Sequence, residues 1–216
     1  FQINSKSSNY RIIEGHQGKM KQIALNPEFI KYGHPKLNRE SKASHLFDTS
    51  AARLFIATRP HINSESLLAC ITEDFCLATA FWEIRLKGEF QSAQSLLALW
   101  FNSTFGFLLL LGFSVNSKAQ IFKFKKTYLR KYPIPQFLLT SERDSARNLY
   151  NEIKDLSLPS FLTQMVQATQ HQGIRYEIDL YFLNLFQEYF GVTFNLSELY
   201  ELFVKEPSLT LDTYSL

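Results

Sequence analysis

Three short apolar runs, separated by polar turns, stand in the first half of the chain. They cover Arg53–Arg59, Leu67–Thr72 and Ala78–Leu86, and the last of them alternates between apolar and polar residues toward its end. Runs of this length, rich in residues that favour extended backbone, are typical of β-strands. Pro60 stops the first run and Gly88 ends the third. We therefore predict a sheet that contains these three strands.

A longer apolar stretch runs from Ser92 to Leu111 and lacks runs of β-branched residues. Its length and composition predict a helix that is apolar around most of its circumference, and such a helix is either buried or spans a membrane. Four polar or small residues stand near its centre: Asn102, Ser103, Thr104 and Gly106. Because they argue against a membrane span, we favour a long buried helix packed on the sheet.

The first fifty residues are polar and irregular, with apolar residues in short clusters only. Tyr10–Ile13 and Gln22–Leu25 have the length and composition of short strands. We expect the polar stretch His34–Ser50 to form a loop. Its basic residues would make this loop a mobile basic arm: Lys36, Arg39, Lys42 and His45.

The segment Tyr132–Pro135 leads out of the sheet region, and its two prolines force an extended backbone there. We place a domain boundary after Gln136. Beyond it, four segments have helical spacing and helix-start signals. They are Ser141–Leu156, Pro159–Gln170, Tyr176–Phe190 and Asn195–Glu206.

These elements predict an α+β fold, with a mixed, mainly antiparallel sheet packed with a long buried helix and followed by a helical C-terminal subdomain. Residues 1–136 would form a basic sheet-and-helix domain, and residues 137–216 an acidic helical subdomain. The first part carries 18 Lys and Arg against 9 Asp and Glu, and the second 5 against 11. A basic half is typical of proteins that bind a polyanion, usually nucleic acid. A solvated basic surface without such a partner is the alternative.

The segment from Ile121 to Tyr132 alternates apolar and basic residues and then gathers five basic side chains within nine positions. These five are the first candidates for a nucleic-acid site: Lys123, Lys125, Lys126, Arg130 and Lys131. They are interleaved with Phe122, Phe124 and Tyr128, and cations beside aromatic rings suit phosphates and bases. An amphipathic strand with a buried Phe face and a solvated Lys face explains the pattern equally well.

A second group of candidates stands at the end of the first predicted strand: Arg53, Arg59, His61 and Asn63. Arg and Asn side chains can read the edges of guanine and adenine through paired hydrogen bonds. An ordinary strand end followed by a turn is the simpler interpretation of the same residues, and we favour it.

No sequence motif of a catalytic or metal site is present. The chain has no Gly-rich phosphate loop, no HExxH or GxSxG motif and no closely spaced His and Cys residues. Cys70 and Cys76 are the only cysteines, which suits a reducing cytoplasm. Arg175 and Asp179 lie one helical turn apart among apolar residues and are interpreted as buried partners. Since Phe1 is not preceded by a methionine or a signal peptide, we expect a cytoplasmic piece of a longer chain.

Three short patterns follow one another along the chain. The predicted buried helix contains Leu99-Trp-Phe-Asn-Ser103, the basic segment leads from Leu129 into Pro-Ile-Pro135, and the tail contains Arg175-Tyr-Glu-Ile-Asp179. In this order they resemble the C-terminal specificity (target-recognition) region of adenine-specific DNA methyltransferases, as in type IIG restriction–modification enzymes. The resemblance covers residues 50–206. Within it, we expect the LxxNS pattern to be scaffold, a polar notch where a helix crosses a strand.

The resemblance implies a module that grips duplex DNA and selects the target sequence, while a separate N-terminal domain methylates adenine using S-adenosylmethionine. The tetrapeptide of that catalytic domain, Asn/Asp-Pro-Pro-Tyr/Phe, is absent, since the only Asn-Pro stands in Asn26-Pro-Glu-Phe29. We therefore expect a non-catalytic DNA-binding module of a prokaryotic restriction–modification or defence enzyme, with no cofactor of its own. Its expected partners are double-stranded DNA and the N-terminal methyltransferase domain of the same chain, and no membrane.

Two other functions compete with this prediction. The first is a protein-interaction scaffold that docks a partner through the aromatic-rich helical tail. The second is a nuclease or other stand-alone enzyme, which we disfavour because the sequence has no cluster of acidic residues and no metal-ligand spacing.

Overall fold

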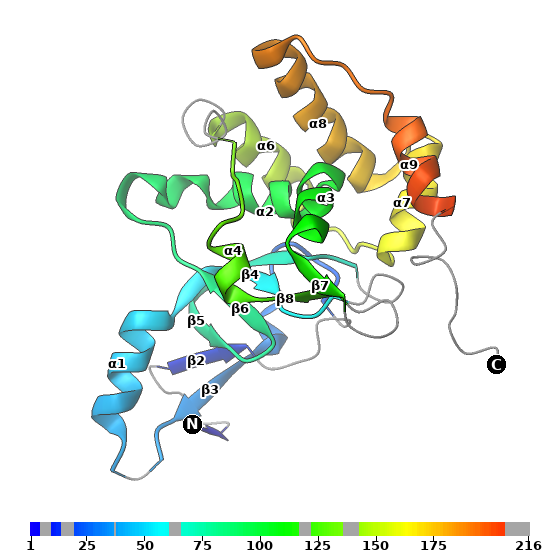
Figure 1. Cartoon of the computed structure of the whole chain (residues 1–216). Helices are drawn as coiled ribbons and strands as arrows, with labels where there is room; N and C mark the ends of the chain where they lie inside the picture. The colour runs from blue at the N-terminus through cyan, green and yellow to red at the C-terminus, as the bar shows by residue number, and fades with distance from the viewer. Residues whose placement is uncertain are drawn as a thin grey trace, which may run out of the picture.

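The computed structural model describes residues 1–4, 10–13, 20–36, 38–60, 66–116, 122–135 and 143–205. Within these ranges a mixed sheet is combined with helices, which is the predicted α+β fold. The sheet lies in the lower half of Figure 1, and most of the helices gather above it.

Six strands form the main sheet: β1 (Gln2–Asn4), β2 (Tyr10–Ile13), β3 (Ile30–His34), β4 (Ala52–Ala57), β5 (Ala69–Ala78) and β6 (Phe81–Ile84). Their order across the sheet is β1-β3-β2-β5-β4-β6. The β2–β5 pair is parallel, and the other neighbouring pairs are antiparallel. The sheet is therefore mixed and mainly antiparallel, as predicted. Two further strands, β7 (Ser114–Asn116) and β8 (Phe122–Phe124), pair with each other.

The helices fall into two groups. Four are short or lie apart from the main group: η2 (Pro27–Phe29), α1 (Glu40–Ser50), η3 (Gly88–Ala93), which leads directly into α2, and α4 (Lys126–Leu129). The others gather over the sheet in Figure 1: α2 (Gln94–Asn102), α3 (Thr104–Gly112), α6 (Arg143–Ile153), α7 (Phe161–Thr169), α8 (Gly173–Phe190) and α9 (Leu196–Lys205). The last four match the four helices predicted for the tail, with ends that differ by a few residues.

Each of the three apolar runs contains a strand, but one boundary was wrong. β5 continues to Ala78, and β6 begins only at Phe81, so a turn divides the run predicted as one strand over Ala78–Leu86. The pairing of β5 with β4 also shifts register between Ala52 and Leu54. Such an irregularity lets a long strand bend and is invisible in the hydrophobic pattern.

The N-terminal region is more ordered than its sequence suggests. Tyr10–Ile13 forms β2 as predicted, whereas Gln22–Leu25 contributes only an isolated bridge from Ala24 to Ile71. The loop predicted over His34–Ser50 is wrong for its larger part, because Glu40–Ser50 forms α1.

Tertiary contacts account for α1, because the helix itself has a weak apolar pattern. The ring of Phe47 packs edge-on against Tyr10 of β2, with 5.5 Å between ring centroids. Arg85, after β6, donates a hydrogen bond of 2.7 Å to the main-chain oxygen of Asp48. Both partners are far away in the sequence, so the predicted basic arm is instead a helix held against the sheet.

The segment predicted as one long buried helix is helical, but it is divided at Ser103 into α2 and α3, which are bent by 76° with η3 counted as part of the first. α2 is buried over most of its length, whereas Leu108 and Leu109 of α3 are exposed. Ser103 has extended backbone angles, and its hydroxyl accepts a hydrogen bond from the Gly106 amide (3.0 Å). The same hydroxyl donates to the Trp100 carbonyl (2.7 Å). Ser103 thus ends one helix and caps the next.

Glycine at position 106 is required by a close approach. A Cβ atom there would stand 1.9 Å from the main-chain oxygen of Trp100, on the last turn of α2. No side chain fits at that distance, so the sharp bend at Ser103 depends on Gly106.

Arg175 and Asp179, both on α8, satisfy the two ends of this break. The Arg175 guanidinium donates to the main-chain oxygen of Asn102, at the end of α2 (2.8 Å). Asp179 accepts a hydrogen bond from the amide of Thr104, at the start of α3 (2.6 Å), and others from the Thr104 and Tyr200 hydroxyls. The cation thus meets the negative end of one helix dipole and the anion the positive end of the next.

Burial sets the protonation equilibria of this pair. Both residues are almost completely buried. Desolvation raises the pKa of the Asp179 carboxyl, while Arg175 and the hydrogen bonds from Thr104 and Tyr200 oppose that shift. The same desolvation lowers the pKa of Arg175, opposed by the charge of Asp179. Arg175 and Asp179, which the sequence predicts to be partners of each other, thus form their hydrogen bonds with the two helix ends between which they lie.

Asn102 joins the helix to the sheet. Its amide oxygen accepts from the backbone amides of Leu68 (2.8 Å) and Ala69 (3.2 Å), and its amide nitrogen donates to the carbonyls of Ala69 (2.8 Å) and Ala98 (2.9 Å). All four hydrogen-bonding positions of this buried side chain are used. The LxxNS pattern therefore has the structural role expected of it, where α2 meets the start of β5.

The predicted domain boundary after Gln136 lies outside the described residues. The hydrophobic core includes side chains from both sides of it. The ring of Trp100 on α2 lies 5.1 Å from that of Phe182 on α8, and Phe107 on α3 lies 4.4 Å from Phe161 on α7.

Among the described residues, no single helix is both long and apolar enough to cross a membrane. The segments Gly88–Asn102 and Thr104–Gly112 reach the necessary length and composition only when they are counted together across their bend.

Replacing Asp179 with Ala should lower the free energy of unfolding by roughly 3–5 kcal/mol, because it leaves Arg175 as an uncompensated buried charge and the Thr104 amide without an acceptor. Urea denaturation measures this change. The control is Glu201→Ala, which breaks the exposed ion pair with Lys205 (2.8 Å) and should leave the urea midpoint nearly unchanged. Similar midpoints for the two variants would contradict the role assigned to Asp179.

Candidate nucleic-acid interface

The strand β8 runs beside the end of β4. The amide of Phe122 donates to the carbonyl of Pro60 (3.2 Å), and the amide of Phe124 donates to the carbonyl of Thr58 (3.0 Å). Arg59 and Lys123 lie between these two bonds, so the backbone that follows β4 runs beside β8 at these residues. Both are exposed. The structure thus brings together one residue from each of the two candidate groups.

The basic segment is a strand for only part of its length. After Phe124 the chain turns into α4, and the backbone bonds from Arg130 to Lys126 (3.1 Å) and from Lys131 to Tyr128 (2.9 Å) continue the turn. Alternation therefore stops at Phe124, which is buried in the core. The basic residues that follow are gathered on one helical turn instead of along one strand face.

Contacts with β6 hold this turn in place. The indole nitrogen of Trp82 donates to the main-chain oxygen of Phe124 (2.7 Å). Lys126 forms an ion pair with Glu83 (2.6 Å), and its ammonium lies 5.5 Å from the centre of the Trp82 ring. The charge of Lys126 is therefore compensated within the protein, and this lysine fixes α4 to the sheet.

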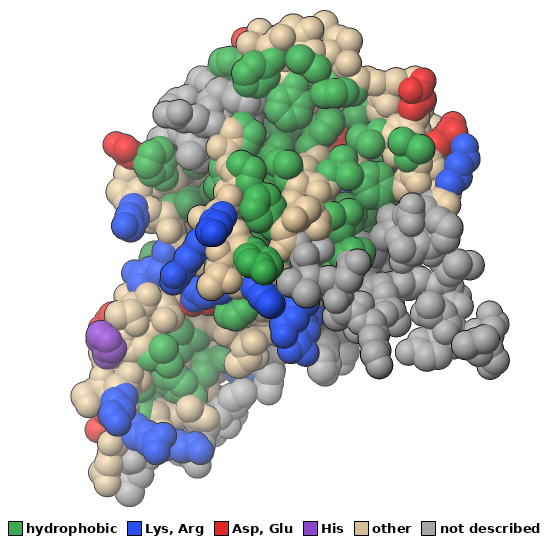
Figure 2. Space-filling view, viewed as in Figure 1, with side chains coloured by type: hydrophobic (Ala, Val, Ile, Leu, Met, Phe, Trp, Pro, Cys, Tyr) green, Lys and Arg blue, Asp and Glu red, His purple; other side chains and the backbone are tan. Residues whose placement is uncertain are grey.

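Five other cations make up what we call the basic face: Arg59, Lys123, Lys125, Arg130 and Lys131. All five are exposed, and none has a carboxylate within ion-pair distance among the described residues. Figure 2 shows Lys and Arg side chains gathered over α4 and the strands beneath it. Tyr128, which is 40% exposed, lies among them, with the Lys125 ammonium 5.5 Å from its ring centre. The face combines uncompensated positive charge with an accessible aromatic ring.

Of the remaining candidates, the structure describes only Arg53, which is not part of the basic face. Arg53 lies at the opposite end of β4, where its Nε donates to the Thr72 carbonyl (3.2 Å) and its side chain lines a cavity. His61 and Asn63 lie outside the described residues. In the described part of the chain, no group of three or more His, Cys, Asp or Glu residues is placed to hold a metal ion.

Two features of this site could not be read from local sequence. The segments of Arg59 and Lys123 are joined by backbone hydrogen bonds between distant parts of the chain, and no motif marks these bonds. The neutralisation of Lys126 depends on Glu83, which lies in the run Ala78–Leu86 and was assigned no role there. The only local signal was the alternation of Phe and Lys, which correctly placed Phe124 inside and Lys123 outside.

No family model, curated protein or solved structure matches this chain. The resemblance to target-recognition regions of DNA methyltransferases therefore stays a prediction from sequence.

Replacing Trp82 with Phe should lower the free energy of unfolding by about 1–2 kcal/mol, because it removes the donor to the Phe124 carbonyl and part of the packing beneath Lys126. The free energy is measured by urea denaturation. Tyr128→Phe is the matched control, since it removes an exposed hydroxyl and should leave the stability within about 0.5 kcal/mol of the parent. If W82F were as stable as Y128F, the indole would not anchor the basic turn.

Proposed function

We propose that this chain is a DNA target-recognition module, and that the basic face binds the backbone of duplex DNA. The observation that carries the proposal is the cluster of five exposed, uncompensated cations around β8 and α4, where backbone hydrogen bonds on either side of Arg59 and Lys123 join the two segments. Arg and Lys side chains on a rigid element bind phosphates and release counterions, which makes the affinity sensitive to salt. A module of this kind also needs loops that enter a groove, because phosphate contacts alone carry no sequence information.

The buried scaffold supports the same proposal. Asn102 and Ser103 belong to the first pattern of the resemblance, and Arg175 and Asp179 to the third. These patterns are separated by some seventy residues, yet they meet at the break between α2 and α3. Their common role explains why both patterns would occur together in one family of folds.

In this proposal a separate N-terminal domain of the same chain binds S-adenosylmethionine and methylates adenine, while the present module holds the DNA and helps to position the target base. The parent would be a prokaryotic restriction–modification or defence enzyme in the cytoplasm. The module itself would have neither catalytic residues nor a cofactor.

A second candidate function, a protein-interaction scaffold, is favoured by apolar side chains exposed on α3, at the end of α8 and just after it. Phe190 is 60% exposed, Phe194 51% and Leu108 39%. The ring of Phe105 contacts Phe194 at 6.1 Å between centroids, so that aromatic side chains form a continuous cluster there. Exposed clusters of this kind mark protein contacts. If the chain is a DNA target-recognition module, the same surface would dock on the catalytic domain or on a partner subunit.

Reversing two charges of the basic face, in Lys123→Glu/Lys125→Glu, should weaken binding to all duplex sequences by roughly tenfold or more and reduce the slope of log K against log salt by about 2. Fluorescence anisotropy with two unrelated duplexes, measured over a salt series, gives both quantities. The control is Lys205→Glu on α9, which should bind DNA like the parent.

Unchanged affinity in the double variant would remove the basic face from the interface. Absence of DNA binding by the parent at low salt, together with self-association that Phe190→Ser abolishes in sedimentation velocity, would favour the scaffold function.

A further inference from the structure

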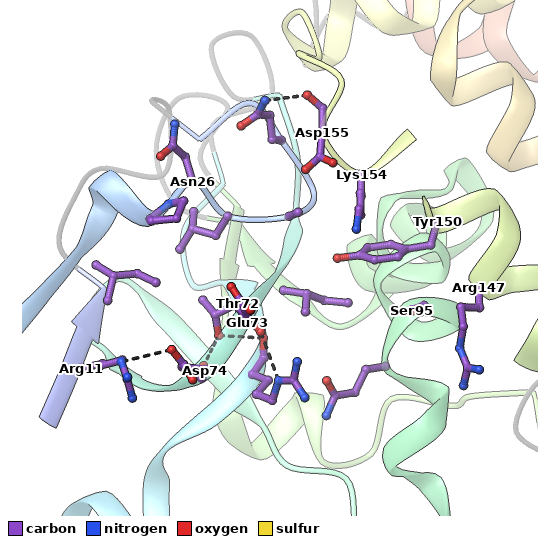
Figure 3. Close-up of a pocket in the computed structure, with 18 of the residues that line it drawn as sticks. Arg11, Asn26, Thr72, Glu73, Asp74, Ser95, Arg147, Tyr150, Lys154 and Asp155 are labelled. Carbon is purple, nitrogen blue, oxygen red and sulfur yellow. Dashed lines mark hydrogen bonds and ion pairs between the residues drawn. The ribbon is translucent and has the colours of Figure 1, made fainter. Parts of the chain in front are cut away.

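A cavity of about 890 Å³ lies apart from the basic face, between the strands and helices α2 and α6. Figure 3 shows its lining, with Arg11, Thr72 and Asp74 on the strand side and Tyr150 and Lys154 on the helix side. Its volume is within the range of sites that hold small organic ligands, and well above that of a single inorganic anion.

The hydroxyl of Tyr150 points into this cavity (Figure 3). The residue is 8% exposed, and its hydroxyl has no hydrogen-bond partner among the described residues. Burial, the largest contribution, raises the pKa of Tyr150 to about 12, so the hydroxyl keeps its proton at neutral pH. The hydroxyl is therefore a donor that is open to the cavity and available to a ligand.

Two cationic side chains, those of Lys154 and Arg53, line the same cavity as this hydroxyl. The ammonium of Lys154 lies 6.0 Å from the centre of the Tyr150 ring and has no carboxylate partner among the described residues. Arg53 uses its Nε on the Thr72 carbonyl, which leaves its two terminal nitrogens without a described protein acceptor. Tyr150, Lys154 and Arg53 thus present donors at the cavity that have no acceptor among the described residues.

The acidic residues of the lining do not supply these acceptors. Asp74 is paired with Arg11 (3.2 Å). Asp155 and Glu73 are exposed, and neither forms an ion pair with Lys154 or Arg53 in the described structure. An anion in the cavity would therefore complete the hydrogen bonding of the donors without displacing an internal ion pair.

Amide side chains line another part of the cavity. Gln91 precedes α2, and Gln94 is the first residue of that helix. Neither side chain has a hydrogen-bond partner among the described residues. An amide presents a donor and an acceptor side by side, the combination that pairs with the edge of a nucleobase. The cavity thus offers donors for an anion and amides for a base.

We propose that this cavity binds a nucleoside monophosphate, with the phosphate held by Tyr150, Arg53 and Lys154 and the base facing Gln91 and Gln94. Phosphate oxygens are strong acceptors that suit a hydroxyl, a guanidinium and an ammonium at once. The site is independent of the DNA-binding proposal, because it uses none of the cations of the basic face.

Tyr150→Phe tests the site, because it removes only a hydroxyl that has no described protein partner. Isothermal titration with adenosine 5′-monophosphate, adenosine and inorganic phosphate should show that the nucleotide binds at least tenfold more tightly than either part. Y150F should lower the affinity for the nucleotide by about tenfold, the effect of one hydrogen bond to a charged group. Its urea midpoint should equal or exceed that of the parent.

Two controls separate this site from the basic face. Tyr128→Phe and Lys123→Glu/Lys125→Glu should bind adenosine 5′-monophosphate like the parent, whereas Lys154→Met should lose affinity as Y150F does. Equal binding of adenosine and its monophosphate, equal binding of phosphate and the monophosphate, or an unchanged affinity in Y150F would overturn the proposal. Loss of binding in the basic-face double variant would also overturn it, by placing the nucleotide on the surface.

Discussion

At the break between α2 and α3, the Asn102 carbonyl and the Thr104 amide have no partner within their own helices. The rest of the structure depends on the side chains that bond to these two groups. Arg175 and Asp179, one turn apart on α8, reach the two sides of the break from one helix. The bend they stabilise directs α3 toward the segment after α4, where the Tyr132 hydroxyl donates to the carbonyl of Gly106 (3.1 Å). The basic face is thereby attached to the core at one end through Tyr132 and at the other through Trp82.

Much of the fold follows from the sequence, because strong periodicity reflects burial. The four tail helices and β4 carry apolar patterns that their contacts with the core explain. By contrast, α1 has a mostly polar sequence and is held by Phe47 and by Arg85, which come from distant parts of the chain. The break at Ser103 was equally hidden, since the apolar pattern continues through it. Its polar residues were recognised as unusual, but their partners on α8 only become visible once the chain is folded.

The candidate site was only partly predictable, because contacts between distant segments decide which of its charges are compensated. Sequence shows that Lys123 and Lys125 are charged, but not whether a charge is compensated. The structure separates Lys126, which is paired with Glu83, from its exposed neighbours, and moves Arg53 to a different cavity. It also brings the segment of Arg59 beside that of Lys123 through backbone hydrogen bonds. Nothing in the sequence indicates that the hydroxyl of Tyr150 faces a cavity, because a buried tyrosine in an amphipathic helix has the same sequence pattern as any other core residue.

The origin of Arg175 and Asp179 in the tail also constrains the order of events on the ribosome. The segment that precedes Gln136 contains the sheet and both halves of the bent apolar stretch, yet the groups that satisfy the bend are translated some forty residues later. Until then the Thr104 amide and the Asn102 carbonyl remain hydrated, and the apolar surface of α2 has no cover from Phe182. The contacts that complete the sheet half therefore form only after synthesis of α8, and they join parts of the chain that are far apart in sequence.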